Sequence, residues 1–395
     1  MSIQPLSIGA FTAICGAGAG RTALLGALQA RRSGLRPNDF TSTPLDTWIG
    51  RIDGLESQPL PGALALWECR NNRLAWSALQ QDGFQEAVRS AIERHGIERI
   101  AVVVGTSTSS IGATEEAYRR LQPDGQYPPD LRRPIIHEPH SLGDFVQHAL
   151  GLSGFCATIA TACSSSAKVF AHAERLIRLG LADAAVVGGA DTLCGSVLFG
   201  FNSLELLSSE PCRPFDPRRN GISIGEGAGF ALLERQGEGP WLLGYGESSD
   251  AYHMSSPHPE GIGARRAILG ALHSGGLAAE DIGYINLHGT ASHKNDEVEG
   301  RLVAELFPPR TFASSTKGWT GHTLGAAGIV ESVITLLALE SGVLPGTLNS
   351  SAVDPACGPQ VRLANEERKL VYALSHSFGF GGSNCVLLFG STRPH

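Results

Sequence analysis

Short apolar runs alternate with amphipathic stretches along almost the whole chain, and this alternation limits the folds that it can adopt. Runs with few polar residues are typical of strands that helices cover on both faces. Longer patterns with helical periodicity separate them. The runs lie at residues 100–104, 184–187, 229–233, 241–246, 282–287, 371–374 and 385–389. The helical patterns lie at 71–95, 167–179, 261–272, 298–306 and 325–344. The sequence therefore predicts a layered α/β fold.

The alternation occurs twice, which favours two similar halves. We infer this duplication from the rhythm of the pattern and not from sequence identity. The best candidate for a linker is the polar, glycine-rich turn at residues 236–240. We therefore expect one half at residues 1–237 and the other at 238–395.

Composition excludes several classes of protein. A net charge of −7 over 395 residues argues against a nucleic-acid binder. The eight cysteines form no C-x-x-C pair, which argues against a zinc knuckle and favours a reducing, cytoplasmic compartment. No basic residue precedes Arg21, and the apolar run at 328–344 is broken by Glu331 and Glu340. We therefore expect neither a signal peptide nor a membrane span.

Cys163 lies where the strand-like run 154–160 turns into the helical pattern 167–179. The N-terminus of a helix carries a partial positive charge, which favours a thiolate over a thiol. Free backbone N–H groups in such a turn can also hold an oxyanion. The alternative is a buried structural cysteine, which a lone cysteine usually is.

Three further turns carry candidate catalytic side chains. His288 ends the apolar run 282–287, at the edge of the sheet where α/β proteins gather their sites. Lys317 and His322 lie in a second turn, ahead of the pattern at 325–344. The third turn is the glycine-rich stretch 377–384.

Taken singly, each turn has an ordinary structural explanation, since a lone histidine is often structural and a lysine is usually on the surface. Zinc binding by Cys163, His288 and His322 is a further alternative. The residues alone leave these explanations open.

Together, the four stretches resemble the active-site motifs of the beta-ketoacyl-acyl-carrier-protein synthases, condensing enzymes of the thiolase fold. The resemblance covers nearly the whole chain and includes Arg213-Pro214-Phe215-Asp216 and the glycine-rich run 225–229. One cysteine followed by two histidines is similar to types I and II, whereas type III would offer Cys-His-Asn. The resemblance implies a layered α-β-α-β-α fold, with the nucleophile in the first half and the histidines and lysine in the second.

The resemblance also implies roles for the matching residues. Cys163 would carry the acyl chain as a thioester. His288 and His322 would donate hydrogen bonds to the malonyl thioester carbonyl and stabilise the enolate. Lys317 would order the site, with Glu299 as its carboxylate partner. Asp296 falls at a matching acidic position.

Further roles follow for the turns that line the substrate. The backbone N–H groups of Cys163 and Phe380 would form the oxyanion hole, and the Phe380 ring would gate entry of malonyl. The remaining substrate contacts that the resemblance implies are Thr290, Ser292, Phe378 and Thr108. The implied reaction is a decarboxylative Claisen condensation that elongates fatty-acid or polyketide chains. It needs no metal and no cofactor beyond the phosphopantetheine of the acyl carrier protein.

Since an acyl carrier protein is acidic, basic side chains should ring the mouth of the site. The candidates are Arg70, Arg73, Arg119, Arg120, Arg132 and Arg133. We expect a homodimer, or a heterodimer with a homologous subunit that resembles a chain-length factor.

Two features leave the substrate open. Thr108 stands where family members limit the depth of the acyl pocket, and a polar residue there favours a functionalised or unsaturated chain, as in aryl-polyene pathways. Ser292 stands where the family usually has Thr. Two rival functions are a non-catalytic chain-length-factor subunit, which typically lacks the cysteine, and a degradative thiolase, which needs a second catalytic cysteine. The context of Cys385 does not resemble such a second cysteine.

Overall fold

The computed structural model describes residues 3–393, in which ten strands of the main sheet form two sets of five. The first set has the order β6-β5-β7-β9-β1 and the second the order β10-β16-β15-β11-β12. The two sets join where β1 pairs with β10 at Leu6 and Ser7. The bounds of the first set are β1 Leu6–Cys15, β5 Ile100–Gly105, β6 Cys156–Ile159, β7 Ala184–Asp191 and β9 Gly227–Glu234. Those of the second are β10 Trp241–Ser249, β11 Tyr284–Asn286, β12 Phe312–Ser314, β15 Tyr372–Gly379 and β16 Ser383–Gly390.

The two sets share one topology, which confirms the predicted duplication. In each set the first strand along the chain lies at an edge, beside the fifth, and the fourth, second and third follow. In each set the second strand is parallel to the third and fourth, and the other two pairings are antiparallel. The boundary expected after residue 237 falls between β9 and β10. Whether the halves are separate domains stays a prediction.

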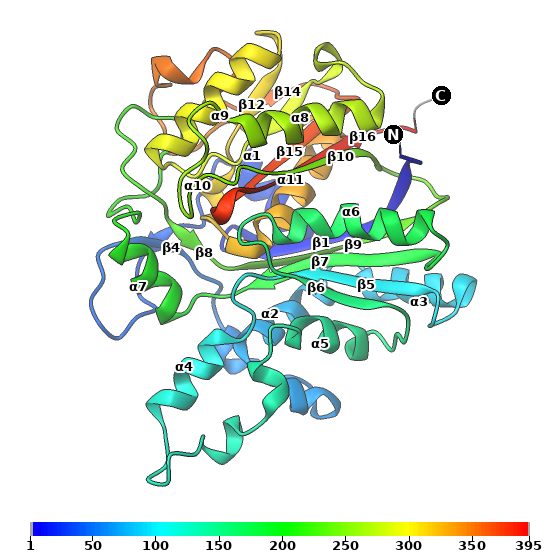
Figure 1. Cartoon of the computed structure of the whole chain (residues 1–395), viewed down its shortest axis with the longest axis vertical. Coiled ribbons are helices and arrows are strands. Elements are labelled where there is room, and N and C mark those ends of the chain that lie inside the picture. Colours follow the sequence, from blue (N-terminus) through cyan, green and yellow to red (C-terminus); the bar gives the residue numbers. More distant parts are fainter. Residues whose placement is uncertain (1–2, 394–395) are drawn as a thin grey trace.

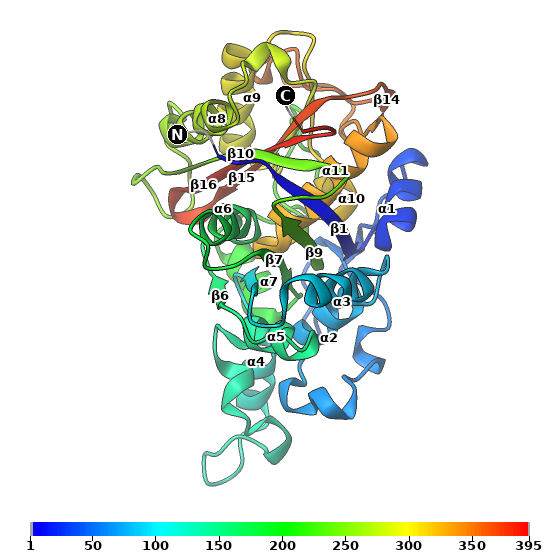
Figure 2. The ribbon, with the colours of Figure 1, turned by 90° about the vertical axis from the view of Figure 1, so that its right-hand side faces the viewer.

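Five layers result (Figures 1 and 2). Helices α6 (Ser165–Arg178) and α11 (Ala327–Ser341) lie between the sets and pack against each other. Helices α2 (Arg70–Leu79), α3 (Phe84–His95) and α5 (Ser141–Ala149) cover the outer face of the first set. Helices α8 (Ile262–Gly275) and α9 (His293–Leu306) cover the second. The predicted α-β-α-β-α arrangement is therefore confirmed.

Shorter elements complete the chain. The remaining helices are α1 Gly20–Gln29, α4 Ile111–Arg119, α7 Gly195–Ser203 and α10 Lys317–Thr320. The short strands are β2 Gly18–Ala19, β3 Arg36–Pro37, β4 Trp48–Gly50, β8 Ile224–Gly225, β13 Val343–Leu344 and β14 Glu366–Glu367. Figures 1 and 2 both show α4 at the end of the molecule farthest from the second set.

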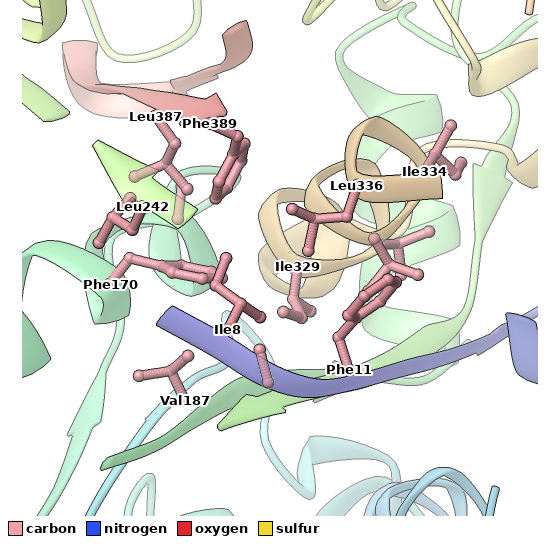
Figure 3. Packing of buried hydrophobic residues seen from close by; sticks show 14 of the residues in the cluster. Ile8, Phe11, Phe170, Val187, Leu242, Ile329, Ile334, Leu336, Leu387 and Phe389 are labelled. Atoms are coloured by element: carbon pink, nitrogen blue, oxygen red, sulfur yellow. The ribbon is translucent and has the colours of Figure 1, made fainter. Parts of the chain in front are cut away.

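The largest core cluster lies around the two central helices. Figure 3 shows Ile8 and Phe11 of β1 facing Ile329 of α11, and Phe170 of α6 facing Phe389 of β16. Burial of this apolar surface on both sides of the central layer drives the two halves together.

The central helix differs from its prediction. The pattern at 325–344 is not one helix, because α11 ends at Ser341 and Gly342 (φ +75°) turns the chain into β13. The stretch Leu324–Ser341 is long and apolar enough to cross a membrane, which the sequence prediction denied, but 89% of it is buried inside the protein. A helix surrounded by other elements needs no polar face.

Strand β7 also differs, because it continues through Gly188 and Gly189, where the sequence predicted a tight turn. A Cβ atom on Gly188 would lie 2.2 Å from the Gly229 carbonyl oxygen, and one on Gly189 would lie 2.3 Å from that of Gly105. The glycines therefore allow close strand packing and do not end the strand.

Candidate active site

Cys163 lies in a tight turn between β6 and α6. Ala162 has φ +51°, a left-handed conformation that is uncommon for a residue with a Cβ atom. This turn places Cys163 directly ahead of the helix and leaves it 5% exposed. The local arrangement that the sequence predicted is therefore present.

Burial of Cys163 opposes the thiolate that the sequence predicted. Burial raises the pKa of the thiol to about 11, although the backbone N–H groups of Phe380 and Cys163 itself and the Lys317 ammonium oppose the rise. The N-terminus of a helix contributes about 0.3–2 kcal/mol. Burial is the largest influence on this thiol, and it acts against the effect of the helix. Burial therefore favours the thiol over the thiolate.

His322 is the nearest polar side chain to the sulfur. Its Nε2 atom lies 3.0 Å from Cys163 Sγ. Its Nδ1 atom accepts the backbone N–H of Leu324 at 3.3 Å, which assigns the proton of the neutral ring to Nε2. Burial and the Lys317 charge hold the pKa of His322 well below 6.5. This imidazole is therefore a neutral N–H donor aimed at the sulfur.

His288 approaches the same point from the end of β11. Its ring centroid lies 5.4 Å from that of His322, with the rings nearly perpendicular at 87°. One ligand atom from each of Cys163, His288 and His322 lies within 4.8 Å of the others. Burial, followed by Lys317 and His322, lowers the pKa of His288 well below 6.5. The structure thus unites three groups that lie far apart in the sequence.

Lys317 orders this centre, but its predicted carboxylate partner is wrong. Its Nζ atom donates to Glu331 and to the carbonyl oxygen of His288. Glu299 instead accepts the backbone N–H groups of His288 and Gly289, each at 2.8 Å. Lys317 begins α10, and Glu331 lies in the second turn of α11, which brings the two side chains together.

Two buried carboxylates near the centre have raised pKa values. Burial raises the pKa of Glu331 to about 7, although Lys317 opposes the rise. Burial also raises that of Asp296 to about 6. Asp296 accepts the backbone N–H groups of Phe215 at 2.7 Å and Ala291 at 3.2 Å. It therefore supports the backbone of the His288 turn.

A pocket of about 330 Å³ leads to His288, and we call it the entry pocket. Thr290 and Ser292 line it, with their hydroxyl oxygens 2.9 Å apart. Phe380 also lines it, and its ring stacks on Phe201 of α7 at 5.5 Å and 22°. The remaining lining residues that concern the site are Phe378, Asn295 and Lys294.

Thr108 lies in a turn that is held by hydrogen bonds to the buried carboxylate of Asp191. Asp191 accepts the hydroxyl of Thr108 at 2.7 Å, its N–H at 3.0 Å, and the N–H of Gly325 in the His322 loop at 2.6 Å. Thr106 and Ser107 donate to it as well. Because the Thr108 hydroxyl is engaged by Asp191, it does not supply the polarity that the sequence assigned to the acyl pocket.

A second pocket, of about 600 Å³, lies beyond this turn, and we call it the side pocket. Ser110 and Thr192, which flank the Asp191-bound segments, both line it. So does Asn71, which is 1% exposed and whose Nδ2 atom has no hydrogen-bond partner among the described residues.

None of the six arginines of the predicted basic surface lines the entry pocket, and each binds groups of this chain, so that carrier binding by them stays a prediction. Arg70 pairs with the fully buried Glu226 at 2.7 Å. Arg73 pairs with Glu68 at 2.5 Å. The other four contact Glu115, Asp130 or backbone carbonyl groups; they are Arg119, Arg120, Arg132 and Arg133. Arg70, Arg73, Arg119 and Arg133 line the side pocket instead.

Sequence reasoning missed three residues that hold the site together: Glu331, Asp191 and His376. Glu331 had a signal, since it lies in the second turn of an apolar helix whose one other charge, Glu340, is near its end. Asp191 follows a run of small residues with no such signal. His376 lies one position before the glycine-rich stretch 377–384 that the resemblance used.

Comparison with known proteins gives two family models that match in sequence order. "Beta-ketoacyl synthase, N-terminal domain" matches residues 71–238, and "Beta-ketoacyl synthase, C-terminal domain" matches residues 241–351. Nodulation protein E of Rhizobium meliloti (strain 1021) is 32% identical over 95% of this chain and 96% of its own length. The 3-oxoacyl-[acyl-carrier-protein] synthase 2 of Vibrio cholerae is 34% identical over 76% of this chain and 79% of its own.

Solved structures agree with these sequence matches. A chain of the complex between the ketosynthase ApeO and its chain length factor ApeC from Xenorhabdus doucetiae superposes with a TM-score of 0.91. It shares 38% sequence identity, and the match covers 98% of each chain.

Proposed function

This chain belongs to the beta-ketoacyl synthase family, and we propose that it condenses a malonyl thioester with an acyl group held on Cys163. Such enzymes are acyltransferases. The observation that carries the assignment of residues is the meeting of Cys163 Sγ, His322 Nε2 and the His288 ring, with His322 Nε2 3.0 Å from the sulfur.

Acyl transfer comes first. The Cys163 sulfur attacks the thioester carbonyl of an acyl carrier protein, and the C–S bond to the phosphopantetheine breaks. The thiol proton of Cys163 leaves with the departing phosphopantetheine sulfur, so no net proton is released. The backbone N–H groups of Cys163 and Phe380 stabilise the tetrahedral oxyanion, because both already face the sulfur.

Decarboxylation and condensation follow. The bond between the malonyl α-carbon and its carboxylate breaks, and its electrons form an enolate at the thioester. The Nε2–H groups of His288 and His322 donate to this oxygen. Because both imidazoles are neutral, they stabilise the enolate without protonating it. The enolate carbon then attacks the acyl group, and Cys163 leaves as a thiolate that takes up one proton.

The test separates the two half-reactions. Intact mass spectrometry after incubation with acyl carriers should show one added acyl group on the wild type and none on Cys163→Ala. His288→Ala and His322→Ala should each lower carbon dioxide release from malonyl-carrier by about a hundred- to a thousandfold. Acylation of Ser164, or unchanged decarboxylation in both histidine variants, would overturn this assignment.

We propose that the centre works without a metal, although its three ligand atoms are close enough to hold one. The proton on His322 Nε2 occupies the position that a metal would need, and Nδ1 is engaged by Leu324. Dialysis against a chelator should leave turnover unchanged, and a loss that zinc restores would contradict this.

The carrier protein is proposed to approach over the entry pocket, where Lys294 lies exposed at the start of α9. No carboxylate among residues 3–393 pairs with it. Thr290 and Ser292 would then bind the phosphopantetheine arm below. Lys294→Glu should raise the KM for the carrier severalfold and leave that for a short pantetheine thioester unchanged. Lys369→Glu, another exposed lysine away from the pocket, serves as the control and should change neither.

The acyl chain is proposed to run from Cys163 past Thr108 towards the side pocket. The Asn71 Nδ2 atom has no partner among the described residues, and the pocket lining includes charged and hydroxyl side chains, which favours a chain with a polar end over a plain alkyl chain. Comparison of saturated, polyenyl and hydroxyl-terminated acyl carriers of equal length tests this, and a preference for the saturated chain would overturn it.

A second candidate function is that of the catalytic subunit of a heterodimer with a chain-length-factor-like partner. The observation that favours it is the ApeO structure, because that ketosynthase was solved with its chain length factor. In this chain, β6 lies at the open edge of the first set, and Phe155 beside it is 45% exposed. We propose that this edge binds a homologous subunit.

The subunit test measures molecular mass in solution for the chain alone and for Phe155→Glu, with Leu179→Glu as the control for an exposed apolar residue elsewhere. Dimers with turnover from the chain alone support a homodimer. A monomer without turnover supports the heterodimer. A dimer that Phe155→Glu leaves intact would remove the proposed interface.

A further inference from the structure

Strand β15 carries a buried histidine, His376, that the reaction above does not use. It is fully buried and lies on the same face of the strand as Leu374 and Phe378, towards α9. Its Nδ1 atom lies 3.0 Å from Glu299 Oε1. Its Nε2 atom has no partner among the described residues. The contact with Glu299 is therefore the one hydrogen bond that this imidazole makes within the described part of the chain.

Glu299 is the point at which α9 holds the His288 turn. Its Oε1 atom accepts the N–H of His288, and its Oε2 atom accepts that of Gly289, each at 2.8 Å. Gly289 has φ +31°, and a Cβ atom there would lie 2.5 Å from the Cβ atom of Ser315. The turn is thus tightly packed, and the two bonds from one carboxylate fix its backbone.

The carboxylate of Glu299 needs a partner of its own to hold its orientation. Lys317 does not supply one, because it pairs with Glu331. Asn295 reaches Glu299 only at 3.4 Å, a weak contact. His376 Nδ1 donates at 3.0 Å, and a hydrogen bond to an ionised carboxylate is among the stronger kinds. His376 therefore sets the side-chain position of Glu299.

The other side of the site does not depend on this contact. His322 is fastened through the backbone of Ser223 and Gly225, and Cys163 through its own turn at the start of α6. Glu299 takes no part in either. A change at His376 should therefore reach His288 and leave the sulfur in place.

We propose that His376 is a positioning residue for decarboxylation: its Nδ1–H orients Glu299, and Glu299 holds the turn that presents His288 to the malonyl carbonyl. This rests on the proposed function. It predicts an effect on one half-reaction, whereas a residue with a merely structural role would affect both.

Two amide substitutions provide matched variants. In His376→Asn the amide nitrogen lies near the place of Nδ1, so it can still donate to Glu299. In His376→Gln the amide nitrogen lies near the place of Nε2, so it cannot donate from the same position. His376→Leu has no donor at either the Nδ1 or the Nε2 position. Two quantities are measured: carbon dioxide release from malonyl-carrier, and the rate of Cys163 acylation by intact mass.

We expect His376→Gln and His376→Leu to lower decarboxylation about ten- to a hundredfold, as expected for the loss of a hydrogen bond to a charged group. His376→Asn should stay within about threefold of the wild type, and all three should acylate Cys163 at rates within about threefold. Similar melting temperatures of the Asn and Gln variants would show that both are folded and can be compared.

Equal decarboxylation in the Asn and Gln variants would overturn the proposal, as would an equal loss of both half-reactions. If the wild type itself releases no carbon dioxide from malonyl-carrier, the proposed function fails instead, so the two failures are distinct.

Discussion

Replacement of Lys317 by Met should destabilise the protein in a pH-dependent manner. Lys317 and Glu331 are 1% and 2% exposed, and removal of one partner of a buried pair costs about 3–5 kcal/mol. Loss of the bond to the His288 carbonyl adds about 1–3 kcal/mol. Glu331 can relieve part of this cost by taking up a proton, because burial already raises its pKa to about 7 and removal of Lys317 raises it further.

The direction of the change in stability with pH follows from the number of protons that the native and unfolded states bind. At pH 6 to 8 the native variant holds a proton on Glu331 that the unfolded chain releases, because the ordinary pKa is 4.5. Stability therefore falls as the pH rises through this range. We expect a loss in the free energy of unfolding of about 2 kcal/mol at pH 6 and about 4 kcal/mol at pH 8, measured by urea unfolding.

The double variant Lys317→Met/Glu331→Leu supplies the control. It should recover stability to within about 1–3 kcal/mol of the wild type, because an apolar pair of similar volume replaces the buried charges and the lost bond to the His288 carbonyl is the remaining cost. It should not recover decarboxylation, because the His288 carbonyl still lacks its donor. An additive double-mutant cycle, or a larger coupling between Lys317 and Glu299 than between Lys317 and Glu331, would refute this reasoning.

Three further predictions follow from buried groups. Because His288 and His322 have pKa values well below 6.5, both rings stay neutral between pH 8 and pH 6, and their NMR signals should show no midpoint of their own near 6.5, although Glu331 titrates in this range; a midpoint near 6.5 that persists in Glu331→Gln would show that one ring titrates normally. Arg70→Met should lower the free energy of unfolding by about 3–5 kcal/mol, because it leaves Glu226 buried and unpaired, yet it should not change the KM for the carrier. Asp191→Asn should cost about 2–5 kcal/mol in urea unfolding, since one of its oxygens becomes an amide that faces the N–H and O–H donors.

The sequence predicted the kind of fold well because apolar runs and helical periodicity are local properties. Strand order is not local. Nothing in the run at 184–187 shows that β7 continues to Asp191, since that depends on how closely Gly188 and Gly189 approach Gly229 and Gly105. The prediction of a turn there relied on glycine composition, which indicates both turns and close packing.

The meeting of Cys163, His288 and His322 could be predicted because they lie in distinctive local motifs, whereas the ion pairs around them could not. Glu299 and Glu331 are both acidic residues near Lys317 in the sequence, and only the path of α11 decides between them. The arginines show the same limit, because Arg70 meets Glu226 across 156 residues. Isolated arginines in a sequence therefore reveal their charge but not whether that charge is already neutralised.

The helices α6 and α11 occupy equivalent places in the two halves, each following the third strand of its set, and both begin at the reactive centre. One copy of the motif supplies the sulfur, and the other supplies the loop with His322. The duplicated architecture has thus become a division of labour: one repeat stores the growing chain and its twin prepares the incoming carbon nucleophile. Neither half holds all three residues, so substitutions in one half are tolerated only if they keep the sulfur of Cys163 next to the rings of His288 and His322.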